Sequence, residues 1–178
     1  EKDTLFINAD KFISQQDKNE KKMLAFKNVK IFKTDLQGKC DSLSYNLSNL
    51  TLEMFYKPVI WVDEFQITSD SIKFLLYQNK IKTMILKPNP IIISEVDSID
   101  YNQIQGRHMT GYFHKNKINK INVDGNGQSI FSIIDEKKNK KIGINFTNCS
   151  NLTLYFKENK LDAINYKIKP NSITTPYR

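Results

Sequence analysis

The feature that most limits the fold of this chain is an internal repeat. Residues 66–93 overlie residues 103–130 after a shift of 37 positions, and residues 146–173 after a further shift of 43, without a gap. The copies share apolar positions, an Asn-Lys dipeptide and a Pro or Gly near the end: Asn79-Lys80, Asn116-Lys117 and Asn159-Lys160, then Pro90, Gly127 and Pro170. Asn-Lys alone is a chance match in such a composition, but three ungapped copies indicate a true repeat.

Two less regular copies extend the repeat toward the N-terminus, one from Leu36 and one from near Ile7. A chain of 178 residues is long enough for one ordinary domain. We therefore predict one domain over residues 1–173, with residues 174–178 as a tail or as the boundary of an excised piece. The expected repeat units are residues 7–35, 36–65, 66–102, 103–145 and 146–173.

Within a unit the apolar residues recur at every second position. Ile72, Phe74 and Leu76 share one parity, as in a strand with one buried face. The Asn-Lys dipeptide predicts a tight turn, because Asn tolerates the left-handed conformation. A second alternation follows each turn. The face expected to be buried comprises Leu43, Tyr45, Leu47, Ile72, Phe74, Leu76, Met109, Phe113, Leu152, Leu154 and Phe156, and on the return strands Met84, Leu86, Ile121, Val123, Ile164 and Tyr166.

Each unit is thus a hairpin followed by a corner and a further short strand. The predicted fold class is all-β: an open β-jellyroll, or roll, of stacked antiparallel strands built from repeated hairpin units. Residues 15–26 carry Lys and Glu that suit a short helix as well as a wide hairpin turn, and we favour the turn. A stack of this kind has two open ends, whose unpaired backbone groups must be capped or joined to another chain.

The charge balance is basic but does not point to nucleic acid. The chain has 27 Lys and Arg against 19 Asp and Glu, a net charge of +8, yet its arginines are Arg107 and Arg178 alone. Nucleic-acid binders favour Arg forks in a basic stripe. Here the lysines are spread along the chain, and Asn and Ile are abundant while Ala is rare, as in products of an AT-rich genome. A solvated Lys-rich surface is therefore favoured over an anionic partner.

Catalysis needs a group of acid, base or nucleophile side chains, and the sequence lacks such a pattern. His108 and His114 lie on one expected strand without cysteine or carboxylate at metal-ligand spacing. The pairs Asp63-Glu64 and Asp97/Asp100 are the nearest approach to a glycosidase-like arrangement, and nothing in their surroundings indicates a shifted pKa. We therefore predict no enzymatic activity, no metal site and no cofactor.

The two cysteines are expected to be free thiols. Cys40 and Cys149 both align with Ser69, so they occupy equivalent positions in different units. Strands lie about 4.8 Å apart, and units separated by several strands exceed the roughly 7 Å that a disulfide spans between Cα atoms. A small, half-buried, reduced side chain is predicted at both positions.

Three segments combine a small residue and a polar neighbour with an alternating strand: residues 38–45 (GKCDSLSY), 68–72 (TSDSI) and 103–113 (QIQGRHMTGYF). A fourth distinctive segment, residues 123–128 (VDGNGQ), contains a strong turn signal at residues 124–127. In these segments the chain resembles the OstA-like (LptA-type) periplasmic family of the lipopolysaccharide-transport machinery, and most of all its Bacteroidetes branch. The resemblance covers about residues 1–173. It implies an open β-jellyroll whose apolar interior shelters lipid acyl chains while sugars and phosphates stay outside.

The resemblance also implies partners and a location. The chain is expected to bind lipopolysaccharide or lipid A and to join other transport components, or copies of itself, by edge-strand pairing. It is expected in the periplasm or at the outer membrane; because the chain starts at Glu1 and not at Met, an export signal is expected to have been removed. The apolar face given above would line the lipid groove, and lysines at its rim would attract lipid phosphates: Lys73, Lys80, Lys82, Lys117, Lys120 and Lys160.

Two other functions stay open at this point. One is a structural or scaffold β domain whose core is filled and whose edges only recruit partners. The other is a polysaccharide or nucleic-acid binder that uses the +8 charge and would show a steep salt dependence.

Overall fold

The structure, a computed structural model, describes residues 4–34, 36–78, 80–115, 117–135, 137–138, 140–158 and 160–177. All elements of the described residues are antiparallel β-strands, which confirms the predicted fold class. They are β1 (Phe6–Asn8), β2 (Lys11–Gln16), β3 (Lys21–Lys33), β4 (Leu36–Asn46), β5 (Thr51–Phe55), β6 (Val59–Val62), β7 (Phe65–Thr68), β8 (Ser71–Tyr77), β9 (Lys80–Lys87), β10 (Ile91–Glu95), β11 (Tyr101–Gln105), β12 (His108–His114), β13 (Lys117–Asp135), β14 (Lys140–Lys157), β15 (Lys160–Lys167) and β16 (Asn171–Pro176).

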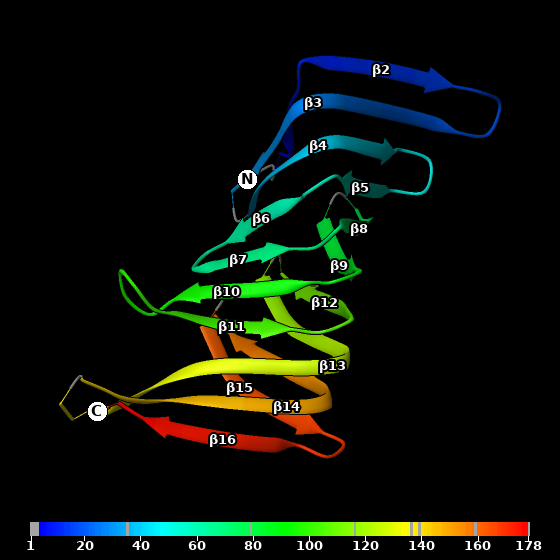
Figure 1. The fold of residues 1–178 in the computed structure, drawn as a ribbon. Coiled ribbons are helices and arrows are strands. Elements are labelled where there is room, and N and C mark those ends of the chain that lie inside the picture. Colours follow the sequence, from blue (N-terminus) through cyan, green and yellow to red (C-terminus); the bar gives the residue numbers. More distant parts are fainter. Residues whose placement is uncertain are drawn as a thin grey trace.

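The chain is a meander of ten rungs that are stacked in sequence order, from β1 and β2 at one end to β15 and β16 at the other (Figure 1). Each rung bends at its middle. The long strands β3, β4, β13 and β14 are each a whole rung, and the other six rungs are the pairs β1–β2, β5–β6, β7–β8, β9–β10, β11–β12 and β15–β16.

The bend divides the stack into two walls. Wall A contains β2, β5, β8, β9, β12 and β15 with residues 21–26, 42–46, 117–124 and 151–157 of the long strands. Wall B contains β1, β6, β7, β10, β11 and β16 with residues 29–33, 36–40, 127–135 and 140–149. The corners join the walls along one seam, and hairpin turns close the rungs on the opposite side of each wall. In Figure 1 the β10–β11 and β13–β14 hairpins project to the same side.

The corners repeat one hydrogen bond. The rungs are counted from the N-terminus, with β1–β2 as the first. In each odd-numbered rung a small residue stands at the corner, and the backbone N–H of the residue after it donates to a corner carbonyl of the next rung. The bonds are Asp10 N to Lys27 O (3.1 Å), Asp41 N to Tyr56 O (3.3 Å), Asp70 N to Pro88 O (3.2 Å), Arg107 N to Gly125 O (2.7 Å) and Ser150 N to Ile168 O (3.1 Å). The sharp bend in the even-numbered rungs requires left-handed backbone, as at Asn126 (φ 54°) and Lys169 (φ 53°). The predicted turn at residues 124–127 is such a corner inside β13.

Three units also share a β-bulge near their wall A hairpin. The register shifts between Leu75 and Leu76, between Tyr112 and Phe113, and between Tyr155 and Phe156, which are equivalent positions of the repeat. The predicted turn residues Asn79, Asn116 and Asn159 lie outside the described residues. Because a bulge adds twist at the same place in each unit, the hairpin ends of wall A follow one another regularly.

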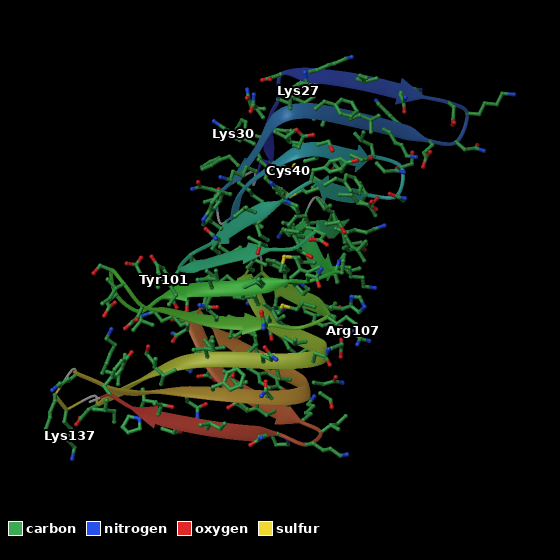
Figure 2. All side chains as sticks on the ribbon, viewed as in Figure 1. Lys27, Lys30, Cys40, Tyr101, Arg107 and Lys137 are labelled. Atoms are coloured by element: carbon green, nitrogen blue, oxygen red, sulfur yellow. The ribbon has the colours of Figure 1, made fainter. Side chains whose placement is uncertain are left out.

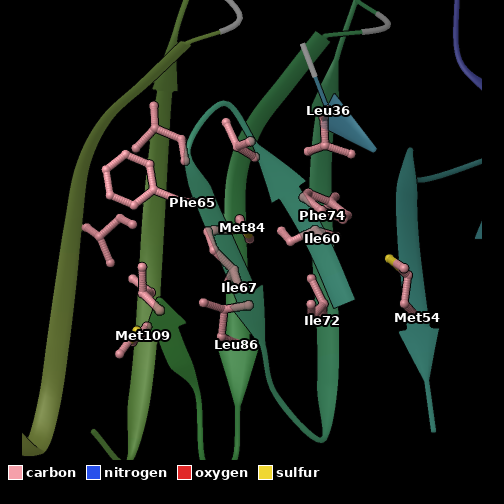
Figure 3. Packing of buried hydrophobic residues seen from close by; sticks show 14 of the residues in the cluster. Leu36, Met54, Ile60, Phe65, Ile67, Ile72, Phe74, Met84, Leu86 and Met109 are labelled. Carbon is pink, nitrogen blue, oxygen red and sulfur yellow. The ribbon is translucent and has the colours of Figure 1, made fainter. Parts of the chain in front are cut away.

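Both walls contribute to one hydrophobic core. Fully buried side chains come from wall A, such as Phe74 (2% exposed) and Met84 (0%), and from wall B, such as Ile60 (0%) and Ile67 (0%). Figure 3 shows these residues meeting between the strands. The core runs through the middle rungs, while β15 and β16 at the C-terminal end are largely exposed.

Four sequence predictions need correction. Leu47 follows the end of β4 and is 39% exposed, so it does not extend the buried alternation. Residues 174–176 belong to β16 and not to a tail. The unit boundary at 145/146 falls inside β14, because an ungapped self-comparison fixes the period of a repeat and not its starting point. Residues 15–26 form a hairpin, as favoured, but a narrow one, whose turn at Asp17–Glu20 joins β2 to β3.

Candidate functional site

The residues predicted to line a groove all belong to wall A, apart from Leu47. Eleven of the 17 are buried: Leu43, Ile72, Phe74, Met84, Leu86, Met109, Phe113, Ile121, Val123, Leu152 and Leu154. Five more are partly buried and pack against the core: Tyr45, Leu76, Phe156, Ile164 and Tyr166. The alternation in the sequence therefore identified one apolar wall.

The facing wall was missed. Its inner row is an isoleucine ladder through the first seven rungs, interrupted by one glycine: Ile7, Ile31, Gly38, Ile60, Ile67, Ile92 and Ile104. Strands of three to five residues, such as β1, β6 and β10, are too short to give a clear period, and the run Ile91-Ile92-Ile93 has no alternation. The shared small residue at the corner is the signal that marks where each short strand begins.

The two walls also contact each other on the side opposite the corner seam, which is called the open side below. The rings of Phe65 from wall B and Phe156 from wall A lie edge to face, with centroids 5.4 Å apart and an interplanar angle of 88°. Edge-to-face pairs at this separation are attractive. The two walls are therefore in contact at this point, opposite the corner seam.

Three depressions lie on the outer surface of the corner seam. Depressions of about 260, 1060 and 350 Å³ lie over successive small corner residues, Cys40, Ser69 and Gly106. They form because the left-handed corners of the even-numbered rungs stand out on either side. The middle one has an apolar floor that includes Phe55, Val59 and Ile91, although it is distinct from the interior.

The six predicted rim lysines divide into three groups. Lys80, Lys117 and Lys160 begin β9, β13 and β15 at the wall A hairpins, are exposed, and form a row of equivalent positions along the open side. Lys82 is exposed at the bulge. The other two have partners on the outer face of wall A: Lys73 Nζ lies 2.6 Å from Glu53 Oε1, and Lys120 Nζ lies 4.7 Å from the centroid of the Tyr112 ring.

Both cysteines are free and buried, as predicted for reduced thiols, though more deeply than half-buried. Cys40 Sγ donates to Ser42 O at 3.1 Å. Burial raises the pKa of Cys40 to about 11 and also raises the pKa of Cys149. Ser69, at the equivalent corner, donates from Oγ to Pro88 O at 2.8 Å. Small residues occupy this position because the inside of the corner is crowded.

The carboxylate pair Asp97/Asp100 has a structural environment. Lys141 bonds to both carboxylates, at 2.6 Å from Asp97 Oδ2, and Tyr177 Oη donates to Asp100 Oδ2 at 3.2 Å. The hydrogen bond from Lys141 and those from the backbone N–H groups of Ile99 and Asp100 lower the pKa of Asp97 to about 2. A general acid needs the opposite shift. Together these contacts fasten the β10–β11 hairpin to β14 and to the end of the chain.

The remaining polar candidates do not assemble into a site. Across the described part of the chain, no three His, Cys, Asp or Glu residues come close enough to hold a metal ion. Positive charge is dispersed: Lys27 and Lys30 lie near one end of the stack, Lys137 near the other, and Arg107 on the corner side (Figure 2). Nor does any described segment form a helix that is long and apolar enough to cross a membrane.

Both ends of the stack have free strand edges among the described residues. β1 and β2 pair with β3, and β15 and β16 pair with β14; each of the four has an outer edge with no strand beside it. The backbone groups on these edges are available to another strand.

A folded antiparallel meander with an apolar interior and open edges among its described residues defines an open β-jellyroll class. No family model matches the chain, and no curated protein matches it. Among solved structures it is similar to LptH from Pseudomonas aeruginosa, the LptA homologous periplasmic component of the conserved lipopolysaccharide transport device. The TM-score is 0.52 and the identity 8%, over 98% of this chain and 96% of that chain. At this identity the likeness shows that the two chains share a fold.

Proposed function

We propose that this protein is a non-enzymatic lipid-binding and transfer module that shelters the acyl chains of lipopolysaccharide on the way to the outer membrane. It would act in the periplasm. The assignment to the OstA-like family, and to its Bacteroidetes branch, is part of this proposal. The fold shared with LptH over nearly the whole of both chains supports it.

One observation carries the proposal: the inner row of wall A is apolar from the first rung to the last. Its members are Phe12, Ala25, Leu43, Met54, Ile72, Leu86, Met109, Val123, Leu152 and Tyr166. A filled core needs apolar residues only where the walls cover them. Phe12 continues the row into the exposed first rung, where it is 46% exposed, and Tyr166 continues it into the last.

Sheltering hydrocarbon suits this row energetically. Each acyl CH₂ removed from water contributes about 0.8 kcal/mol, so a single chain of a dozen carbons gains several kcal/mol without a polar contact. Part of that gain offsets the free energy needed to separate the rings of Phe65 and Phe156. The exposed lysines Lys80, Lys117 and Lys160 would lie beside phosphates at the opening, each adding a weak, salt-sensitive attraction.

The free edges would supply the partners. β1–β2 and β15–β16 are proposed to pair with other transport components or with copies of the same chain. Neighbouring interiors would then be continuous along the stack.

The test replaces an inner side chain and its outer neighbour. Phe156→Asp places a charge on the inner face of wall A, whereas Tyr155→Asp places the same charge on the outer face, where Tyr155 is already 40% exposed. Lipid A binding, followed by native mass spectrometry, should be lost in Phe156→Asp and kept in Tyr155→Asp, with the β circular-dichroism signal intact in both. Equal binding by the two variants would refute an interior site.

The scaffold function has one observation in its favour, the contact between the rings of Phe65 and Phe156 across the interior. In that case the core stays filled and only the edges act. The protein would form concentration-dependent oligomers and take up no lipid, so a clean unliganded mass throughout a lipid A titration would favour it.

A further inference from the structure

The inner row of wall B changes character along the stack. After the isoleucine ladder of the first seven rungs, the last three rungs present Ser129, Thr147 and Ser172 at the same register. Ser129 is 1% exposed and Thr147 is 3% exposed, so these two hydroxyls lie inside the molecule, whereas Ser172 is exposed on β16. Burying a hydroxyl costs free energy that isoleucine in the same row does not incur.

The neighbouring inner row becomes polar as well. Asn145 Nδ2 donates to Ser172 Oγ at 2.8 Å and to Thr174 Oγ1 at 3.1 Å, and Thr147 Oγ1 donates to Asn145 Oδ1 at 2.9 Å or to Ser172 Oγ at 3.0 Å. These groups form one connected set. A hydroxyl has one donor and two acceptor positions, so the set retains capacity for a further hydrogen bond.

The opposite wall does not change. Leu152 and Leu154 are buried on wall A beside these rungs, and Ile164 and Tyr166 of β15 are half-buried. Tyr166 Oη lies 2.7 Å from Ser129 Oγ and so joins the two walls near the corner. The facing walls of the last rungs therefore differ, one being apolar and the other polar, and the polar wall ends at the exposed strand β16.

None of the five inner polar side chains of these rungs is charged: Ser129, Asn145, Thr147, Ser172 and Thr174. The set therefore suits a neutral hydrogen-bonding group, such as a hydroxyl or an amide, better than a phosphate or a carboxylate. A ligand that satisfies both walls has such a group next to a hydrocarbon chain.

We propose that the C-terminal rungs bind the polar segment of a hydroxylated or amide-linked acyl chain, with the hydrocarbon directed toward the isoleucine ladder. This proposal rests on the proposed lipid-binding function and adds a substrate class and an orientation to it. The hydroxyl ladder makes the interior selective, whereas an interior of isoleucine alone would disfavour a hydroxylated chain.

The experiment compares two probes of equal length, tetradecanoic acid and 3-hydroxytetradecanoic acid, by isothermal titration below their aggregation concentrations. The wild-type chain should bind the hydroxylated acid more tightly. In Thr147→Val, which keeps the shape and removes the hydroxyl, the ratio of the two dissociation constants should fall about fivefold, the worth of one hydrogen bond. Binding of the plain acid should stay within about twofold.

Two further variants make the result interpretable. Ser129→Ala removes a second inner hydroxyl and should lower the same ratio, which covers the case in which Thr147→Val fails to fold. Thr175→Val makes the matched change on the outer face of β16 and should leave the ratio unchanged. If the wild-type chain binds both acids equally, or binds tetradecanoic acid more tightly, the hydroxyl ladder is not a recognition element and the proposed function stands. If it binds neither acid, both proposals fail.

Discussion

The crowded inside of the corner makes Gly106→Ala a quantitative test of the bend. Gly106 joins β11 to β12, and a Cβ added there would lie 2.3 Å from Val123 Cγ1, well inside van der Waals contact. Val123 is completely buried, so it cannot turn away. Overpacking of this kind costs about 1–3 kcal/mol. For a domain of this size, about 2 kcal/mol lowers the melting temperature by roughly 4–8 °C.

A double-mutant cycle isolates the contact. Val123→Ala removes the atom that the new methyl group would meet, so Gly106→Ala should cost less than about 1 kcal/mol in that background, a coupling of about 1–2 kcal/mol. Gly111→Ala is the control, because its Cβ would meet the flexible Met84 methyl group at 3.1 Å. Urea denaturation followed by circular dichroism gives all the values. An equal cost of Gly106→Ala in both backgrounds would show that the corner does not depend on this packing.

Two further predictions concern ionisation and thiol chemistry. The folded-state pKa of Asp97 is lowered to about 2 from 3.8, so its contribution to stability is present above about pH 4 and is lost as the pH falls toward 2; in Lys141→Met this part of the pH dependence of unfolding should flatten. An acid limb that is unchanged in Lys141→Met would contradict the assignment. Cys40 and Cys149 should both react with a thiol reagent under denaturing, non-reducing conditions and should react slowly in the native protein at pH 8, because burial raises both pKa values. Detection of fewer than two thiols after denaturation would show that a disulfide had formed.

Wall A was predictable because its strands are long enough to show a period. β8 and β9, of seven and eight residues, present their apolar side chains at alternate positions between turns. The equivalence of Cys40, Ser69 and Cys149 also gave the correct state of the thiols, since equivalent corners lie several rungs apart.

Wall B was not predictable because the corners interrupt the alternation in two different ways. In the odd-numbered rungs the inner face changes parity at the corner, as from Cys40 to Leu43 within β4. In the even-numbered rungs the corner contains one or two left-handed residues, and in β13 the parity continues across them from Val123 to Gly127. If the alternation seen on wall A is extended past the corner, it therefore assigns the wall B residues of the odd-numbered rungs to the wrong face. The contact between Phe65 and Phe156 joins rungs that are distant in the sequence, and no local pattern indicates it.

The two kinds of corner have a consequence for how such a molecule can change length. One rung alone cannot be added or removed, because successive rungs run in opposite directions between the two walls. With one rung more or less, each later rung would run in the wrong direction for its corner, and the corner hydrogen bonds would no longer match. Two rungs together restore the direction, the wall and the corner hydrogen bond, and they change the stack by roughly 10 Å. The length of the interior can therefore change only in steps of two rungs. Duplication of a repeat unit would lengthen the stack and leave the strands at both of its ends unchanged.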